Sequence, residues 1–279
     1  MYFPKFWSKG HWNGFFAWGW SDESQELAKE LGDSRAKNIG TLIGQKKIIR
    51  SESYGYSKTP LREEILEEIK DENIKIIITR NSYGCEVLNT NNVIFIDVDL
   101  FVKAPKRSIM DVLLGRNRFN KLEAKNTLEI EKLKLLENFC KKNPDFGFRI
   151  YKTAAGLRYL VTTHLNLPDQ KIIQELFKSL DCDPYYAKLC LLQKSFRARL
   201  TPKPWRCGID RPSIRFPYES IDQLNLHKNW LSKYSQVSKN FQTTSFVKTI
   251  GQAKVLDEIL KVVNIHDERT IGGSNRELA

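Results

Sequence analysis

The chain has 279 residues, and its 45 lysine and arginine residues against 33 aspartate and glutamate residues give a formal net charge of +12 at pH 7. Apolar residues make up 41% of the sequence and aromatic residues 11%, which excludes a disordered or fibrous protein. No apolar run approaches the roughly 18 residues of a membrane-spanning helix, and the aromatic amino terminus lacks the pattern of a signal peptide. We therefore expect a basic, cytoplasmic protein with an acidic partner.

The first two expected elements are rich in aromatic residues. Residues 12–20 (WNGFFAWGW) predict a strand interrupted by glycine, and residues 21–43 predict a helix with Ser21 or Asp22 as its N-cap. Four tryptophans occur within the first 20 residues. They either pack in the core or offer faces on which nucleobases stack.

The next stretch predicts the strands of a sheet. Residues 46–57 indicate a strand, whereas the apolar spacing of residues 61–71 predicts a helix. Three β-branched runs follow at 74–79, 85–89 and 93–100, and their continuous apolar character is typical of strands buried on both faces. The short turns between these runs favour hairpin-like neighbours.

The second half of the chain combines a hairpin with several helices. Strands over 146–153 and 157–164 are joined by Ala154, Ala155 and Gly156. Amphipathic spacing and capping residues predict helices over 127–142, 167–180, Asp183 to about Lys194, 221–240 and 252–264. The polar tail from Ile271 is expected to fray.

Together these elements predict an α+β fold with a mixed, largely antiparallel central sheet and flanking helices. We divide the chain into an aromatic-rich region over 1–60, a sheet domain over 61–220 and a helical region over 221–279. The three regions are expected to form one compact unit. The sheet domain carries every functional candidate considered below.

The run VIFIDVDL (93–100) carries Asp97 and Asp99 among apolar residues. Because side chains alternate along a strand, both carboxylates point to the same face. Two like charges placed together call for a cation, and paired carboxylates are usual ligands of Mg²⁺ or Mn²⁺ where a phosphate is the substrate. The alternative is a strand end at which both side chains reach water or pair with arginine.

A second candidate lies in the segment AAGLRYLVTTH (154–164). Gly156 allows a phosphate or another backbone to approach closely, and the planar guanidinium of Arg158 suits a phosphate or a carboxylate. The alternative is an ordinary surface arginine in a hairpin. His164 alternates onto the same face, but a histidine at a strand end is more often structural.

The third candidate is a basic strip, FRARLTPKPWR (196–206). An extended chain places Arg197 and Arg199 on one face, and two prolines stiffen the strip and exclude helix. A preorganised cationic strip suits a polyanion, and an aromatic face allows a base to stack. The side chains to which we assign nucleic-acid binding are Arg197, Arg199, Lys203, Trp205 and Arg206. The alternative is a solvated loop whose arginines pair with Asp97 and Asp99.

The positive charge is concentrated in two windows. Residues 100–121 hold six basic residues and one acidic residue, and residues 188–216 hold eight and one. The rest of the chain is balanced, so the net charge indicates a local footprint for phosphate.

The five cysteines show neither a CxxC pair nor a regular spacing, which argues against a disulfide framework and a zinc ribbon. Cys182, Cys190 and Cys207 could gather around a metal with His164. Buried structural thiols are the commoner arrangement.

Four segments carry a family resemblance: 79–90 (TRNSYGCEVLNT), 96–99 (IDVD), 151–162 (YKTAAGLRYLVT) and 196–208 (FRARLTPKPWRCG). Together they resemble a family of uncharacterised bacterial proteins over most of the chain. More loosely, the chain is similar to the archaeo-eukaryotic primase superfamily, which includes primase-polymerases. That resemblance implies a primase-polymerase-like fold and a nucleotidyltransferase activity.

In that superfamily a strand with two aspartates binds metal, and here Asp97 and Asp99 match it. The segment Ala155–Arg158 resembles the nucleotide-contacting strand, with Arg158 at the position of the superfamily's histidine. Arg199, Pro202 and Lys203 resemble its basic segment. The superfamily's third carboxylate has three candidates here, Asp181, Asp183 and Asp210.

The expected function is therefore a Mg²⁺- or Mn²⁺-dependent nucleotidyltransferase that acts on a nucleoside triphosphate or a nucleic acid. Asp97 and Asp99 would hold the metal, and Arg158 would neutralise charge in the transition state together with Arg199 and Lys203. Two alternatives stay open: a nucleic-acid-binding module without chemistry, and a sugar-nucleotide transferase of the DxD type.

Overall fold

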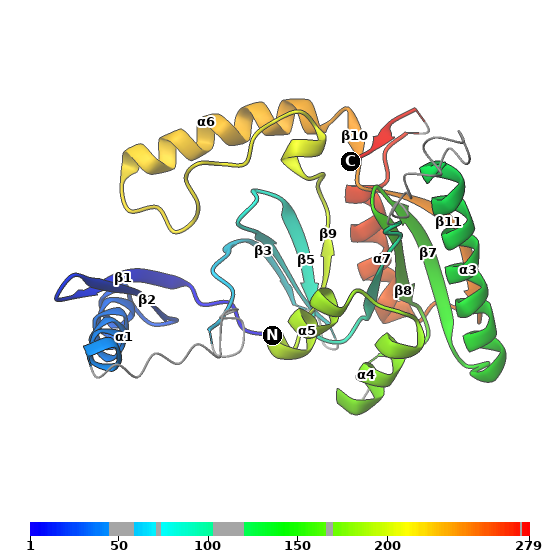
Figure 1. Ribbon diagram of the computed structural model, residues 1–279, viewed down its shortest axis with the longest axis horizontal. Helices are drawn as coiled ribbons and strands as arrows, with labels where there is room; N and C mark the ends of the chain where they lie inside the picture. Colours follow the sequence, from blue (N-terminus) through cyan, green and yellow to red (C-terminus); the bar gives the residue numbers. More distant parts are fainter. Residues whose placement is uncertain (45–58, 71–73, 103–119, 166–169, 274) are drawn as a thin grey trace, which may run out of the picture. The chain divides into compact units, whose positions relative to one another are not determined.

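The structure is a computed structural model that describes residues 1–44, 59–70, 74–102, 120–165, 170–273 and 275–279. Contacts divide the chain into two compact units, each built from two segments (Figure 1). Unit 1 consists of Met1–Thr90 and Leu189–Lys239, and unit 2 consists of Asn91–Lys188 and Asn240–Ala279. The predicted α+β class is confirmed. No helix in the described part of the chain is long and apolar enough to cross a membrane.

Unit 1 contains six strands, two α-helices and one short 3₁₀ helix among the described residues. They are β1 (Phe6–Trp12), β2 (Phe15–Ser21), α1 (Gln25–Gly44), β3 (Glu64–Lys70), β4 (Lys75–Arg80), β5 (Glu86–Thr90), β9 (Phe196–Arg199), η1 (Pro204–Arg206) and α6 (Ile221–Ser238). Helix α5 (Pro184–Gln193) contains one of the boundaries between the units. The strand predicted over 46–57 lies outside the described residues.

The amino terminus forms a two-stranded hairpin that packs on α1 (Figure 1). Asn13 and Gly14 join β1 and β2 with φ values of 44° and 82°, as a type I′ turn requires. The prediction of one strand over 12–20 is therefore wrong, because this Asn-Gly turn divides the aromatic run. The predicted N-cap is also wrong, since the Ser24 hydroxyl accepts the Leu27 N–H at 3.2 Å.

Helix α1 approaches the hairpin through small residues. A Cβ atom added to Gly10 would lie 1.8 Å from the carbonyl carbon of Gly32. We expect Gly10→Ala to lower the free energy of unfolding by about 2–3 kcal/mol, because the backbone itself must move. Gly44→Ala, with nothing within 4 Å of its added Cβ, is the matched control. Equal denaturant midpoints for the two variants would contradict this close packing.

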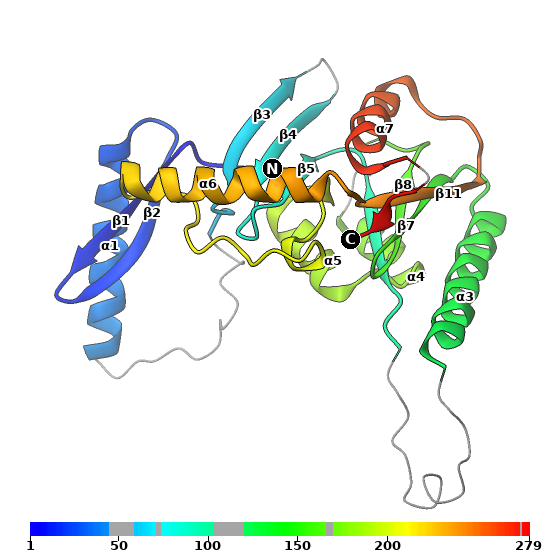
Figure 2. The same cartoon turned by 90° about the horizontal axis from the view of Figure 1, so that it is seen from above.

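The main sheet of unit 1 is antiparallel, in the order β3-β4-β5-β9 (Figure 2). Ile76, Ile77 and Ile78 in β4 are buried and form part of its core. The helix predicted over 61–71 is wrong, because this segment forms edge strand β3 with a bulge between Ile65 and Glu67. Its apolar residues fit a helical spacing, but pairing with the apolar β4 overrides that preference.

Unit 2 contains six strands and three α-helices among its described residues. They are β6 (Phe95–Asp99), α3 (Lys121–Lys142), β7 (Gly147–Thr153), β8 (Gly156–Val161), α4 (Gln170–Ser179), β10 (Phe241–Gln242), β11 (Thr244–Gly251), α7 (Asp257–Thr270) and β12 (Glu277–Leu278). The predicted hairpin and the predicted helices of the second half are all present, with ends shifted by a few residues.

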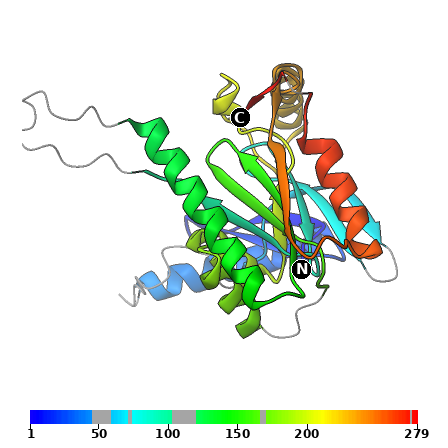
Figure 3. The same cartoon turned by 90° about the vertical axis from the view of Figure 1, so that its right-hand side faces the viewer.

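The main sheet of unit 2 is antiparallel, in the order β11-β7-β8-β6. Helix α3 covers one face, where it contacts Tyr159 and Phe148. Helix α7 covers the other face, where its His266 lies against the rings of Tyr151 and Phe95. Figure 3 shows α3 and α7 on the two sides of these strands. Asp97 and Arg158 lie on the face that α7 covers.

Several expectations about organisation need correction. The expected neighbours β5 and β6 lie in different units, because β6 pairs with β8. The sheet domain expected over 61–220 is therefore divided between the units at Thr90 and Asn91, and the described residues form two four-stranded sheets where one central sheet was expected. The tail does not fray, because β12 pairs with β10, and residues 244–251 form a strand where none was predicted.

Candidate functional site

The two aspartates of β6 lie where the sequence predicts them, on one face of an edge strand. Asp97 lies opposite Arg158 in the β6–β8 ladder, and Asp99 lies opposite Gly156. The Asp97 side chain is 32% exposed, and Asp99 is exposed. At Gly156 an added Cβ would lie 2.0 Å from the carbonyl oxygen of Val98, so the predicted close approach at this glycine is to backbone.

Arg158 is buried, with only 2% of its side chain exposed, so it is not a surface arginine. Its Nε donates to Oδ1 of Asp97 at 2.8 Å, and its Nη2 donates to Oδ2 at 3.3 Å. Burial alone would lower the pKa of Arg158, but the charge and hydrogen bonds of Asp97 outweigh burial and raise it. One of the two arrangements left open by the sequence, an aspartate paired with arginine, is therefore present at Asp97.

Behind Arg158 lies a histidine that sequence analysis did not select. Nη1 of Arg158 lies 3.4 Å from Nε2 of His266, which is fully buried. Nδ1 of His266 lies 2.9 Å from Oδ1 of Asp267. Burial lowers the pKa of His266 to about 4, and the charge of Arg158 acts in the same direction. The imidazole is therefore neutral at physiological pH.

The other side of Asp267 is held by a second arginine. Nη2 of Arg149 donates to Oδ2 of Asp267 at 2.6 Å, and its Nε donates to the hydroxyl of Tyr151 at 2.8 Å. Burial disfavours the Asp267 carboxylate, but hydrogen bonds from His266 and Tyr151 and the charge of Arg149 together lower its pKa. The result is one connected polar network from Asp97 to Arg149 beneath α7.

Acidification is expected to destabilise unit 2 through His266. Its pKa falls from 6.5 in the unfolded chain to about 4 in the folded protein, so the unfolded chain binds more protons between these values. The corresponding stabilisation is present above the unfolded pKa and lost as the pH falls through this window, on the order of 3 kcal/mol. Unfolding free energies of wild type and His266→Gln against pH measure it. Parallel curves would contradict a neutral histidine.

The carboxylate oxygens of Asp97 and Asp99 are the kind of ligand that a hard divalent cation prefers. Each oxygen of Asp97 accepts one hydrogen bond from Arg158, which leaves a second lone pair on each, and Asp99 presents its carboxylate on the same exposed side. Among the described residues, no group of three or more histidine, cysteine, aspartate or glutamate side chains is placed to hold a metal. Asp97 and Asp99 would thus supply two protein ligands, with the remaining positions left to water or phosphate.

Within the described part of unit 2, neither Asp181 nor Asp183 forms a metal-binding group with the two aspartates, although the backbone N–H of Asp183 donates to the Asp97 carbonyl at 2.8 Å. Asp181 forms an ion pair with Lys132. The Asp183 carboxylate caps α5, accepting the Tyr186 N–H at 2.7 Å. Asp210 belongs to unit 1. His164, which alternation places on the face of Arg158, instead stacks on Phe146 with ring centroids 4.0 Å apart.

The basic strip belongs to unit 1, so the predicted residues form two groups, one in each unit. Arg197 does not face a polyanion: its side chain is 8% exposed and Nη2 contacts both carboxylate oxygens of Glu63, at 2.7 and 2.9 Å. Glu63 also accepts the Thr79 hydroxyl at 2.6 Å. Arg197 is therefore neutralised by a buried acid that the sequence analysis placed in a helix, and these contacts do not support nucleic-acid binding by Arg197.

The end of the strip contributes to a partly exposed cluster of aromatic and cationic side chains, Tyr83, Lys203, Trp205 and Arg211, which we call the Trp205 cluster. Trp205 is 39% exposed and meets Tyr83 edge to face, with ring centroids 5.2 Å apart. The guanidinium of Arg211 lies 4.3 Å from the Trp205 ring centroid and 4.8 Å from that of Tyr83. Lys203 lies 5.5 Å from the Trp205 ring. The prolines do not exclude helix entirely, since Pro204 begins the single turn η1.

Arg199 and Arg206, the other predicted binding residues, are both partly buried in unit 1. The charge window over 100–121 lies mostly outside the described residues. All five cysteines are buried and none forms a disulfide, as the structural interpretation expects.

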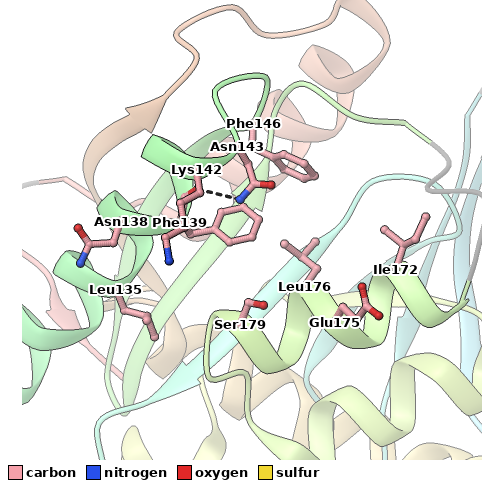
Figure 4. A pocket seen from close by; sticks show the side chains of 10 residues that line it. All are labelled: Leu135, Asn138, Phe139, Lys142, Asn143, Phe146, Ile172, Glu175, Leu176 and Ser179. Carbon is pink, nitrogen blue, oxygen red and sulfur yellow. Dashed lines mark hydrogen bonds between the residues drawn. The ribbon is translucent and has the colours of Figure 1, made fainter.

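A pocket of about 470 Å³ lies between α3 and α4 in unit 2, and none of the residues that line it was predicted to be functional (Figure 4). Its walls are mainly apolar, with Phe139 and Leu135 from α3 facing Leu176 and Ile172 from α4. The side-chain amide of Asn143 donates to the Phe139 carbonyl at 2.9 Å and closes the end of α3. The pocket contains one lysine and one glutamate and no paired carboxylates.

No protein-family model, curated protein or solved structure matches the chain. The resemblance to the primase superfamily therefore stays a prediction.

Proposed function

We propose that this protein is a divalent-metal-dependent enzyme acting on nucleotide or nucleic-acid phosphates, a nucleotidyltransferase of the primase-polymerase kind. The observation that carries the proposal is the state of Asp97. Its carboxylate is held on both oxygens by a buried arginine, yet a third of the side chain stays exposed beside Asp99. A buried ion pair adds little stability, because the cost of desolvating its charges offsets their attraction. A buried network that orients a partly exposed carboxylate is therefore more typical of a functional site.

In this proposal Asp97 and Asp99 hold Mg²⁺ or Mn²⁺. Such an ion, when bound, binds the triphosphate oxygens and lowers the pKa of an attacking hydroxyl. The task of the chain is to orient the Asp97 carboxylate and to place a counter-charge beside it, and the buried Arg158 does both. Arg158 therefore acts on the carboxylate, and the earlier expectation that it clamps phosphate has no support from its contacts.

The experiment is a transfer assay with labelled nucleoside triphosphates, with and without an oligonucleotide, in Mn²⁺, Mg²⁺ or chelator. The proposal predicts incorporation that requires the divalent ion and is lost on chelation. Labelled sugar nucleotides serve as the competing substrate, because a DxD transferase would use them instead. Absence of transfer from every nucleotide, in a protein that still binds nucleic acid, would reject the enzyme.

The second candidate is a nucleic-acid-binding module without chemistry, and the Trp205 cluster favours it. Two aromatic rings lie beside Lys203 and Arg211, and such a combination suits unstacked bases and phosphates. We expect Trp205→Ala to weaken binding of a single-stranded oligonucleotide about tenfold, the loss of one stacked base. Tyr185→Ala, which removes an exposed aromatic ring of α5, is the control.

Salt dependence tests the phosphate contacts of this second candidate. With two contacts to a single strand, from Lys203 and Arg211, affinity is expected to fall about sevenfold between about 50 and 200 mM salt. Fluorescence anisotropy measures both the variant and the salt series. An affinity indifferent to salt, with Trp205→Ala binding as wild type, would reject nucleic-acid binding through this cluster.

A further inference from the structure

The hydrogen bonds around His266 define its tautomer. Asp267 is an ionised acceptor, since Arg149 holds its other oxygen at 2.6 Å, so Nδ1 of His266 must carry the proton. Nε2 of the neutral ring then has a free lone pair. That atom lies 3.4 Å from Nη1 of Arg158, which can only donate. The ring is therefore a donor toward Asp267 and an acceptor toward Arg158.

We propose that His266 and Asp267 are positioning residues for the metal-binding carboxylate, acting through Arg158 in the order Asp267–His266–Arg158–Asp97. This inference rests on the proposed function. Arg158 uses Nε and Nη2 on Asp97, and only Nη1 points to His266. A contact at that third nitrogen fixes the rotation of the guanidinium plane, and with it the plane of the Asp97 carboxylate.

The positions of these residues in the fold support a role beyond local packing. Arg158 is on β8, Asp97 on β6, and His266 with Asp267 on α7, so three elements far apart in the sequence meet at one guanidinium. His266 also packs between Tyr151 and Phe95, with ring centroids 4.6 and 5.5 Å away, which restrict its tilt. Residues that hydrogen-bond to metal ligands without touching the metal set the orientation and basicity of those ligands. Their loss typically lowers metal affinity 10–100-fold.

The test compares two variants at His266 with a buried histidine elsewhere. His266→Leu removes the acceptor toward Arg158, whereas His266→Gln can replace it with an amide oxygen near the position of Nε2. His227→Gln is the matched control, since His227 is buried in unit 1 and bonds to the Ile214 carbonyl at 3.0 Å. Mn²⁺ affinity is measured by electron paramagnetic resonance, and the imidazole tautomer by nitrogen NMR at neutral pH.

The proposal expects Mn²⁺ binding weakened about 10–100-fold in His266→Leu, largely restored in His266→Gln and unchanged in His227→Gln. Nitrogen NMR is expected to show His266 as the neutral Nδ1–H form. If wild type binds Mn²⁺ and His266→Leu binds it equally, the positioning role is rejected while the metal site stands. If wild type binds no Mn²⁺, the proposed function itself fails. An Nε2–H or doubly protonated ring would overturn the assigned relay independently of metal.

Discussion

The Asp99→Asn variant is expected to fold as the wild type does and to lose at least about 100-fold of its nucleotidyl transfer. Asp99 is exposed at the end of β6, so removing its charge should change the unfolding free energy by less than about 0.5 kcal/mol. As a metal ligand, Asp99 is expected to contribute at least as much as residues that only hydrogen-bond to a ligand. Loss of such residues typically lowers metal affinity or activity 10–100-fold. Transfer rates and denaturant midpoints of the same preparations give both quantities.

Asp97→Asn provides the contrast, because the Asp97 carboxylate is paired with a buried arginine. Its loss leaves the buried Arg158 without its carboxylate, at a cost of about 3 kcal/mol, the lower end for a buried pair because Asp97 is 32% exposed. Asp145→Asn, an exposed aspartate of unit 2, is the control for both variants. Full activity in Asp99→Asn would show that this carboxylate has no catalytic part.

Glu63→Gln is expected to destabilise unit 1 by about 3–5 kcal/mol, the largest effect on stability predicted here. Both members of the Glu63–Arg197 pair are 8% exposed, so the variant leaves a buried guanidinium without its counter-charge. The double variant Glu63→Gln/Arg197→Met removes that charge and should recover part of the loss. Chemical denaturation of the single and double variants measures the coupling.

Glu219→Gln is the control for this pair. Glu219 lies 3.8 Å from Lys9 at the surface, with both side chains at least 30% exposed, and such pairs contribute about 0.5 kcal/mol or less. A Glu63→Gln variant as stable as Glu219→Gln would mean that Arg197 is solvated. That result would also return Arg197 to the candidate nucleic-acid contacts.

Strong local patterns in the sequence predict their elements well. The strands β4, β5 and β6, the β7–β8 hairpin and the amphipathic helices of the second half are all present. In each of them the apolar pattern of the sequence matches the face or faces that the element buries. The helix predicted over 61–71 is wrong because the alternation of apolar and glutamate residues in this segment fits a helix as well as an edge strand. Pairing with the neighbouring strand β4 determines that it forms a strand. The Asn13-Gly14 dipeptide is a typical signal of a hairpin turn, but it was missed because aromatic residues on both sides of it resemble one continuous strand.

The candidate site was predictable only where its residues are local in sequence. Alternation along β6 places Asp97 and Asp99 on one face, but nothing in the sequence pairs Asp97 with Arg158, since ladder register is a tertiary property. His266 and Asp267 come from α7, more than 100 residues after Arg158. Their one signal was a histidine beside an aspartate, two residues after the end of the helix predicted over 252–264. Glu63 was missed because its segment was assigned to a helix.

The proposed function requires that Asp97 and Asp99 together hold a divalent ion. Mn²⁺ binding to wild type and to Asp99→Asn, followed by the loss of the free-ion signal in electron paramagnetic resonance, tests it most directly. Mn²⁺ is expected to bind saturably to wild type, at least about tenfold more weakly to Asp99→Asn, and to Asp145→Asn with the affinity of wild type. Equal Mn²⁺ affinity in wild type and Asp99→Asn would contradict it.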